Sequence, residues 1–397
     1  RKNRIFASFA KQNASSANTR FFRRLSLEIF HSGTPSFFTC GKEKHCYDHL
    51  MNYAAANENL SHTILNILNK NYPSHCSNAQ IYLNTIANNN KVFLIKIKNK
   101  KCILRQSSAS KSPQDLQLEV EFLTYLHEKK FRLTPYIIPN TKGSLVTLHK
   151  KKYYILENFL PGTVKKSVNN LTNFNEKKLV SLFSALAKFS IASQGFMASH
   201  PKENRPISYY VKNGSKLLTG VIKKIRNKTI KDLLEENLVF TIDFVKETAS
   251  QLHAINYDKL PKQIVHFDLH PGNVNYVENR LSGIFDFDWV RFDNRLVDLA
   301  CTLGQSCYSY RGKNRALYDT NKIALGLKAY RIAYGKSEYG LREENEIITA
   351  ALRGYMFFQL LWIIEWHIKN PKDKEGDQYI RFSLDVLKKN NFESLFD

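Results

Sequence analysis

The six cysteines of this chain include no Cys-x-x-Cys pair, which is the spacing that most structural zinc sites use. One group of potential zinc ligands is present, at Cys40, His45, Cys46 and His49. Its spacing fits none of the common zinc patterns, so we expect no zinc there. Unpaired thiols suit a reducing compartment, and we expect the protein to work in the cytoplasm.

The sequence also lacks an apolar run long enough to span a bilayer, for which about 20 residues are needed. The nearest candidate, Tyr355 to Trp366, is shorter and contains Gln359 and Glu365. We therefore expect this stretch to be a buried helix, and we expect no membrane partner.

Acidic residues are scarce, because 35 Asp and Glu stand against 59 Lys and Arg, which gives a net charge of +24. Such a charge is typical of nucleic-acid binders, whose affinity falls steeply with salt. The basic residues are spread along the chain, with only short clusters at 96–101, 150–152 and 223–228. We therefore expect no nucleic-acid partner, and we interpret the basic surface as one that attracts an anionic nucleotide.

The first 27 residues contain seven Lys or Arg and no acid, and the first methionine is Met51. This composition is typical of a mitochondrial-type presequence, which would place the protein in an organelle. A poorly ordered extension, or reading frame upstream of a start at Met51, would look the same. In each case we expect residues 1–50 to be a weakly ordered basic extension with no catalytic group.

The stretch from Gln263 to Ala300 carries the chemistry. An apolar run, a polar turn and a second apolar run predict strand, loop and strand, and a third short strand ends in acids. The oxygen-bearing side chains at these loops are Asp268, Asn273, Asp286 and Asp288. Brought together, they would form an oxygen-rich cage of the kind that Mg²⁺ prefers. The alternative is a sheet with polar hairpin loops and scattered surface acids.

This stretch resembles the catalytic and metal loops of the kinase fold, in the branch that holds aminoglycoside phosphotransferases, choline kinases and homoserine kinase-like enzymes. The resemblance is carried by His266-x-Asp268-Leu-His-Pro-Gly-Asn273, by Ile284-Phe-Asp286-Phe-Asp288 and by Asp298-Leu-Ala. Phosphoryl transfer requires mainly an aligned hydroxyl and neutralised phosphate charge, which such loops can supply.

The resemblance assigns roles to these residues. Asp268 would be the catalytic base, and His266, which we count with it as catalytic, would brace the loop rather than do chemistry. Asn273 and Asp286 would hold Mg²⁺. Asp288 would be a second metal or water ligand. Asp298 would cap the following helix and tie the loop down.

The amino-terminal half predicts a small antiparallel sheet, with turns at Asn88–Asn90 and Lys98–Lys100. By the resemblance, the first turn, with Asn89 and Asn90, would lie over the ATP phosphates although it lacks glycine. Arg105 stands where the family has a phosphate-pairing lysine. Glu119, on a predicted helix over 118–129, would orient Arg105 or else be solvated.

A further helix is predicted over 57–70, with Ser61 as a plausible cap. The segment that ends in Glu157 and Phe159 would form the hinge, whose backbone grips adenine in the family. We place the lobe boundary there, with an N-lobe over 51–158 and a C-lobe over 159–397.

The sequence thus predicts an α+β, two-lobed, protein-kinase-like fold, with a small antiparallel sheet and one helix in the N-lobe and a larger, mainly helical C-lobe. No activation segment and no Ala-Pro-Glu follow Asp288, which favours a small acceptor over a protein. We expect an ATP- and Mg²⁺-dependent kinase for a hydroxyl of a small metabolite: an amino alcohol, a homoserine-like compound or an amino sugar. The alternative, suggested by Arg105, is a nucleotide-binding pseudokinase that acts as an interaction module. The acceptor and the oligomeric state stay open.

Overall fold

The computed structural model describes residues 53–73, 79–84, 90–108, 111–162, 174–199, 204–309, 312–371 and 374–396. The chain divides into two compact units, an N-terminal unit of residues 1–163 and a C-terminal unit of residues 164–397. The predicted extension over residues 1–50 and the Cys40–His49 group lie outside the described residues.

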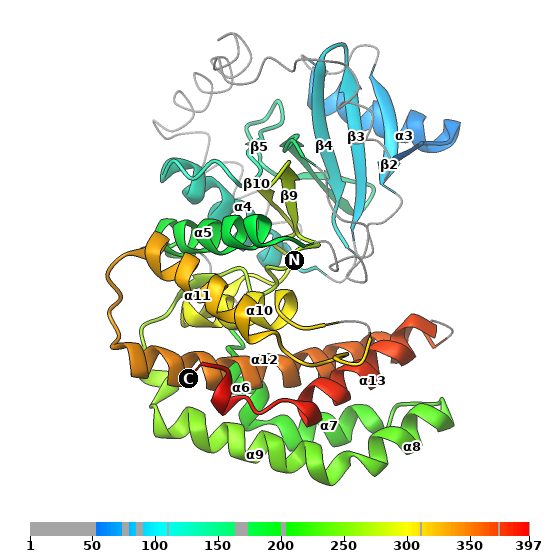
Figure 1. Cartoon of the computed structure of the whole chain (residues 1–397). Coiled ribbons are helices and arrows are strands. Elements are labelled where there is room, and N and C mark those ends of the chain that lie inside the picture. Colours follow the sequence, from blue (N-terminus) through cyan, green and yellow to red (C-terminus); the bar gives the residue numbers. More distant parts are fainter. Residues whose placement is uncertain are drawn as a thin grey trace. The chain divides into compact units, whose positions relative to one another are not determined.

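The N-terminal unit is built on an antiparallel sheet (Figure 1). Its elements are β1 (Tyr53–Ala55), α3 (Glu58–Asn71), β2 (Gln80–Asn84), β3 (Lys91–Ile97), β4 (Lys100–Gln106), α4 (Pro113–Glu128), β5 (Ile137–Ile138), β6 (Thr147–His149) and β7 (Lys152–Asn158). The strand order is β1-β2-β3-β4-β7-β5, and β6 pairs with β7. The predicted hairpin of β3 and β4 is confirmed.

Alternation along the strands gives this sheet two different faces. On one face, Phe93 and Leu104 pack in a buried cluster with Ile67 of α3. The next residue after Leu104 is Arg105, which therefore points to the opposite face. The predicted helix over 57–70 is confirmed as α3, but its cap is Asn57 and not Ser61. The Asn57 side chain accepts a hydrogen bond from the Leu60 backbone N–H.

Helix α4 begins at Pro113, five residues before the predicted start. Ser112 and Asp115 form a reciprocal capping box, in which each side chain accepts a hydrogen bond from the other residue's backbone N–H. Proline suits the first turn because its missing N–H would have no partner there. This capping sequence fixes Glu119 in the second turn of the helix.

The C-terminal unit is mainly helical. Its helices are α5 (Glu176–Ala192), α6 (Ile207–Lys212), α7 (Gly214–Ile222), α8 (Lys228–Glu236), α9 (Leu238–Ala254), α10 (Leu296–Ser306), α11 (Thr320–Tyr334), α12 (Leu341–Lys369) and α13 (Lys374–Lys389), with short 3₁₀ turns η5 (Tyr257–Lys259) and η6 (Glu393–Leu395). Its strands are β8 (Gln263–Val265), β9 (Val274–Val277), β10 (Arg280–Ile284) and β11 (Arg291–Asp293). They form two antiparallel pairs, β9 with β10 and β8 with β11.

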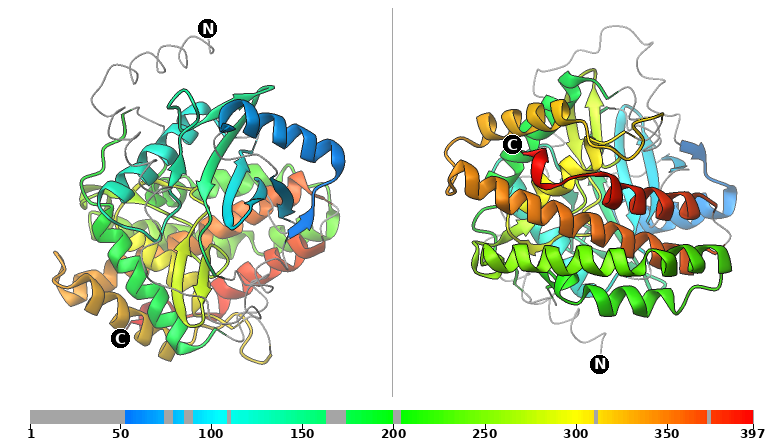
Figure 2. Two further views of the ribbon diagram at one scale, coloured as in Figure 1. Left: turned by 90° about the horizontal axis from the view of Figure 1, so that it is seen from above. Right: turned by 60° about the horizontal axis from the view of Figure 1, so that its bottom comes forward.

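Helix α12 is the central helix of this unit, and α9 and α13 lie along it (Figure 2). It is the one helix of the described residues that is long and apolar enough to cross a membrane. The prediction that no such stretch exists is wrong. It considered only Tyr355 to Trp366, whereas the apolar residues of the helix continue upstream of Tyr355. Within its most apolar window, 83% is buried inside the protein. The expectation of a buried helix is therefore confirmed.

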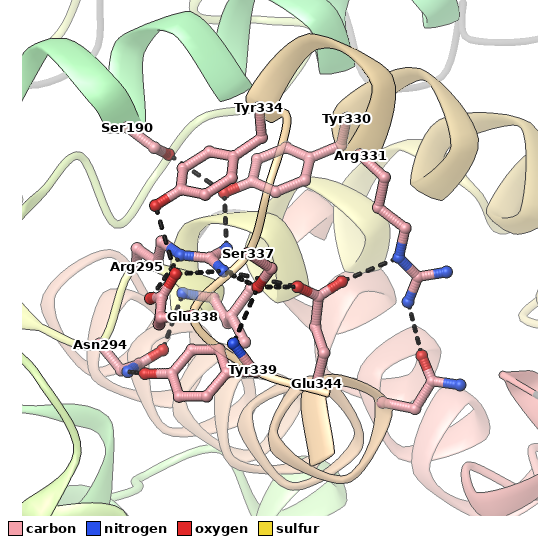
Figure 3. Close-up of polar contacts among 12 residues, drawn as sticks. Ser190, Asn294, Arg295, Tyr330, Arg331, Tyr334, Ser337, Glu338, Tyr339 and Glu344 are labelled. Atoms are coloured by element: carbon pink, nitrogen blue, oxygen red, sulfur yellow. Dashed lines mark hydrogen bonds and ion pairs between the residues drawn. The ribbon is translucent and has the colours of Figure 1, made fainter. Parts of the chain in front are cut away.

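A buried arginine ties the start of α10 to its neighbours (Figure 3). Arg295 donates to both carboxylate oxygens of Glu338, at 2.9 and 3.0 Å, and to the hydroxyl of Ser337 at 2.7 Å. Its guanidinium also lies 4.1 Å from the ring centre of Tyr334 on α11. Because its side chain is only 2% exposed, these paired contacts offset the cost of burying the charge. They fix the end of α10 that lies next to the predicted catalytic stretch.

The predicted fold class is confirmed. The antiparallel sheet lies in the amino-terminal part and the helical part follows it, and α3 is an addition to the single helix of that description.

Candidate active site

The predicted catalytic loop leaves β8 through a strained residue. Phe267 has a φ of 66°, a conformation that costs a bulky L-residue roughly 1–2 kcal/mol. Asp298 compensates, because its buried carboxylate accepts hydrogen bonds from the backbone N–H of His266 (2.8 Å) and of Phe267 (2.6 Å). The turn at Phe267 redirects the chain, so that Asp268 reaches the partly exposed side of the loop.

Asp298 does part of what was expected of it. It ties the loop down, as predicted, but it does not cap α10. The helix begins at Leu296, whose N–H donates to the side chain of Asn294, two residues upstream. Asp298 lies inside the first turn of α10, so its own side chain is directed at the loop.

His266 is fully buried and bridges two loops. Its Nε2 contacts the Phe285 carbonyl oxygen at 3.1 Å, and its Nδ1 lies 3.3 Å from the Asp268 N–H. These contacts assign the proton to Nε2, which donates to the carbonyl, while Nδ1 accepts. A neutral ring held in this way positions Asp268 and has no open atom for proton transfer.

Asn273 folds back onto Asp268. Its Nδ2 donates to the main-chain oxygen of Asp268 at 2.9 Å and to its carboxylate Oδ2 at 3.1 Å. Both of these hydrogen bonds use the amide nitrogen, so they orient Oδ1 of Asn273 as a possible metal ligand. Gly272 is required next to it, because a Cβ there would lie 2.6 Å from the His270 ring.

The strand register brings Asp286 to the same place. Ile284 of β10 pairs with Val274 of β9, and the Phe285 N–H donates to the Asn273 carbonyl at 3.1 Å. The next residue, Asp286, has a φ of 67°, a left-handed conformation that Asp tolerates better than most residues. Asn273 and Asp286 are therefore neighbours across the end of one hairpin.

The carboxylates of this site repel one another. Burial raises the pKa of Asp268 well above its ordinary value, and the negative charges of Asp286 and Asp288 raise this pKa further. A divalent cation among these carboxylates would relieve the repulsion, so the donor set of three carboxylates and one amide oxygen fits Mg²⁺. Within the described ranges no group of three His, Cys, Asp or Glu forms a metal cage. A magnesium ion that is held mainly by phosphate and water does not need one.

His270 is beside this site but adds no charge to it. Burial lowers the pKa of His270 to about 4, so its ring is neutral at pH 7. Its Nδ1 accepts from the Gly272 N–H at 3.0 Å, which fixes the turn of the loop. The distance of 3.8 Å from its Nε2 to Asp268 is therefore not an ion pair under neutral conditions.

In the N-terminal unit, Arg105 joins two acids. It donates from Nε and Nη2 to one carboxylate oxygen of Glu157, at 3.0 and 2.9 Å, and from Nη2 to Glu119 of α4. Lys111 pairs with the second oxygen of Glu119. Glu157 lies diagonally from Arg105 on the same sheet face, because Arg105 is paired with Ile155 in the register of β4 and β7. All four charged side chains are at most 9% exposed, and the charges of the cluster sum to zero.

Replacing Arg105 with methionine is expected to lower the free energy of unfolding by about 3–5 kcal/mol, because it leaves a buried carboxylate without its partner. Arg105→Lys should lower the free energy of unfolding by less, since lysine keeps the charge and lacks only the planar guanidinium with its several donors. Chemical denaturation of both variants measures this. Lys91→Met, which removes an exposed cation from β3, is the control and should change stability little. If Arg105→Met lowered the free energy of unfolding no more than Lys91→Met does, the ion-pair account would be contradicted.

The other residues expected to contact the nucleotide lie as follows. Asn90 is buried, and its side chain accepts from the Ser108 N–H at 2.9 Å, whereas Asn89 lies outside the described residues. Glu157 is within β7, where it pairs with β4 and β5, so its backbone belongs to the sheet. Phe159 follows the strand, and the Lys101 ammonium lies 5.3 Å from its ring centre.

Three contributors were missed from the sequence. Lys111 directly precedes the capping box of α4, and that signature could have drawn attention to it. The Thr302 hydroxyl donates to the Leu269 carbonyl at 3.0 Å, and the Cys301 thiol donates to the Phe267 carbonyl at 3.4 Å. Both residues hold the catalytic loop against α10, and no sequence pattern indicates such contacts.

Comparison with known proteins agrees with this geometry. The profile of a phosphotransferase enzyme family matches residues 85–340. The homoserine kinase of Methylocella silvestris is 29% identical over 120 residues, which is 29% of this chain and 35% of that relative. The match thus spans about a third of the relative's length.

Two solved structures share the fold. An amicoumacin kinase in complex with AMP-PNP, Ca²⁺ and its ligand has a TM-score of 0.59 and 15% identity, covering 85% of this chain and 95% of that one. A choline/ethanolamine kinase family protein from Mesorhizobium loti has a TM-score of 0.57 and 14% identity, with coverages of 85% and 97%. At these identities the likeness establishes the fold.

Proposed function

The chain belongs to the phosphotransferase enzyme family, and on that premise we propose that it is an ATP- and Mg²⁺-dependent kinase that phosphorylates a hydroxyl group of a small metabolite. The acceptor classes that this proposal includes are amino alcohols, homoserine-like compounds and amino sugars. The names of the relatives and of the structural neighbours support the first two of these classes.

One observation supports the proposal most strongly. Asp268, Asn273 and Asp286 come from two loops, and hydrogen bonds and register bring them to the end of one hairpin. Burial and the charges of Asp286 and Asp288 raise the pKa of Asp268. A loop with no role beyond a polar turn would not require such a cluster of acids. Such an arrangement suits a site that works with a cation.

In the proposed reaction Asp268 accepts the proton of the acceptor hydroxyl as the oxygen attacks the γ-phosphorus of ATP. The bond from that phosphorus to the bridging oxygen of the β-phosphate breaks, and ADP leaves. Asn273 and Asp286 would hold Mg²⁺, which when bound neutralises phosphate charge. His266 and Asp298 keep the backbone at Asp268 in place through the contacts described above. The chain's contribution is therefore position and charge, which is what phosphoryl transfer requires.

The test is acceptor-dependent ADP release, measured against pH at two concentrations of Mg²⁺. Chelation of the metal should abolish release. Asp268 must be ionised to accept a proton, and its raised pKa places the acid limb of kcat/KM above the usual range of an aspartate. Because a cation lowers the pKa of a neighbouring acid, more Mg²⁺ should move this limb to lower pH. ADP release that persists in the presence of a chelator would contradict the proposal. So would an acid limb of kcat/KM that does not shift with Mg²⁺ concentration.

A second function is favoured by one observation. Arg105 replaces the lysine of the family pattern, and Glu157 and Glu119 engage its Nε and Nη2. A nucleotide-binding pseudokinase that acts as an interaction module would tolerate such an arginine. It would bind nucleotide, and it would release no ADP with any acceptor.

A further inference from the structure

The C-terminal unit buries an arginine that forms no ion pair with a described acid. Arg291 of β11 is only 8% exposed, yet among the described residues no carboxylate lies within 4.0 Å of its guanidinium. Buried arginines are normally paired, because an unpaired buried charge costs several kcal/mol. The neighbouring Arg295 follows this rule, with Glu338 and Glu344 as partners. The charge of Arg291 opposes the rise in the pKa of three buried carboxyl groups, those of Asp268, Asp293 and Asp298, but none of these groups forms an ion pair with it.

Main-chain oxygens hold one side of the guanidinium. Nε donates to the carbonyl of Trp289 at 3.2 Å, and Nη1 donates to the carbonyl of Arg205 at 2.9 Å. The remaining Nη2 forms no hydrogen bond with a described residue, and it is not sealed from solvent. The fork is thus fixed in direction and has donor capacity left for a ligand.

Four aromatic rings surround the same group. The guanidinium carbon lies 3.7 Å from the ring centre of Phe267, 5.5 Å from Phe358, 5.6 Å from Tyr210 and 5.6 Å from Trp289. Such a box of rings would suit an organic cation, including a quaternary ammonium. In this chain its own arginine fills the box, so a cationic acceptor group would meet a positive charge there.

The location connects this cation to catalysis. Phe267, on which the guanidinium stacks most closely, directly precedes Asp268 in the catalytic loop. Arg291 is also near enough to Asp268 to oppose the rise in the pKa of that carboxyl. A substrate whose hydroxyl reaches Asp268 would therefore lie within the field of Arg291.

We propose that Arg291 binds an acidic group of the acceptor, a carboxylate or a phosphate, and so selects hydroxyl compounds that carry an anion over amino alcohols that carry only a cation. This inference rests on the proposed function and narrows its acceptor class. Arginine suits the task because its planar fork can donate two hydrogen bonds to one anionic group.

The experiment compares acceptors in pairs that differ only in the acidic group. The pairs are L-homoserine with 3-amino-1-propanol, L-serine with ethanolamine, and glycerol 3-phosphate with glycerol, and choline is added as a quaternary cation. The wild-type chain should prefer the acidic member of at least one pair by about 10- to 100-fold in kcat/KM, as a charge-assisted hydrogen bond implies. Comparison of the homoserine pair with the glycerol 3-phosphate pair shows whether the anionic group that Arg291 binds is a carboxylate or a phosphate.

Variants then assign the preference to Arg291. Arg291→Met should lower kcat/KM for the acidic acceptor by about 10- to 100-fold relative to kcat/KM for its neutral or cationic partner in the same variant. Arg291→Lys should keep part of the preference. Arg205→Gln, which removes an exposed guanidinium from the adjacent segment and keeps the carbonyl that Arg291 uses, is the matched control and should keep all of it. Since each measure is a ratio within one variant, partial unfolding cannot imitate it.

Each possible outcome of these measurements either supports or contradicts the role of Arg291. A best acceptor without an anion, a preference that survives in Arg291→Met, or ATP turnover with Mg²⁺ but no phosphorylation of any acidic acceptor would overturn the inference. The proposed function would still stand after the first two outcomes. Absence of ATP turnover under all conditions would instead overturn the proposed function itself.

Discussion

Replacing Asp268 with asparagine is expected to lower kcat for phosphoryl transfer by about 10²- to 10⁴-fold, the range for loss of a general base. The amide has the shape of the carboxylate and can still accept the hydrogen bond from Asn273 Nδ2, so the loop keeps its geometry. What is lost is the ability to take the proton of the acceptor hydroxyl.

The same substitution should leave the fold as stable as before or more stable. The pKa of Asp268 is raised in the folded chain, so above the ordinary pKa of an aspartate its ionisation opposes folding. Asparagine removes this charge and its repulsion with Asp286 and Asp288. Melting at pH 7 without Mg²⁺ measures the effect, and Asp243→Asn on the exposed surface of α9 is the control. A variant that is both inactive and much less stable would contradict the catalytic role.

Replacing Asp286 with asparagine should lower kcat/KM by more than about 100-fold, because even the loss of a group that supports a metal ligand costs 10- to 100-fold. Part of the activity should return at high Mg²⁺, since the variant weakens metal binding and leaves Asp268 intact. Asparagine is the appropriate substitution here, because Asp286 has a φ of 67° and asparagine tolerates that conformation. Alanine would add backbone strain of roughly 1–2 kcal/mol to the loss of the ligand.

Mg²⁺ titrations of the initial rate distinguish this role from a structural one. Asp288→Asn is the comparison, because Asp288 was assigned only a second metal or a water, and its effect should be smaller. An Asp286→Asn chain with wild-type Mg²⁺ dependence would remove Asp286 from the metal site.

The active-site loop could be predicted because its chemistry is local in sequence. Asp268 and Asn273 are five residues apart on one loop, and the alternating apolar residues around them predict the strands that hold it. The position of Asp286 followed from the next strand of the same hairpin. Short-range patterns of this kind constrain both the fold and the identity of the reacting groups.

Other features could not be predicted, because they depend on contacts between distant segments. The pairing of Asp298 with the N–H groups of His266 and Phe267 spans about thirty residues, and it stabilises a left-handed phenylalanine that no propensity favours. The partners of Arg105 come from a helix and from a strand 52 residues away. Arg291 has no sequence signature, because the rings around it come from separate elements of the chain.

The most direct measurement of the central claim is the appearance of a phosphorylated acceptor from ATP, followed by mass spectrometry for the wild-type chain and for Asp268→Asn. The account predicts phosphorylated product from the wild type only when Mg²⁺ is present, and at least a hundredfold less from the variant at equal folded concentration. Equal product from the two chains would show that Asp268 is not the base and would contradict the account.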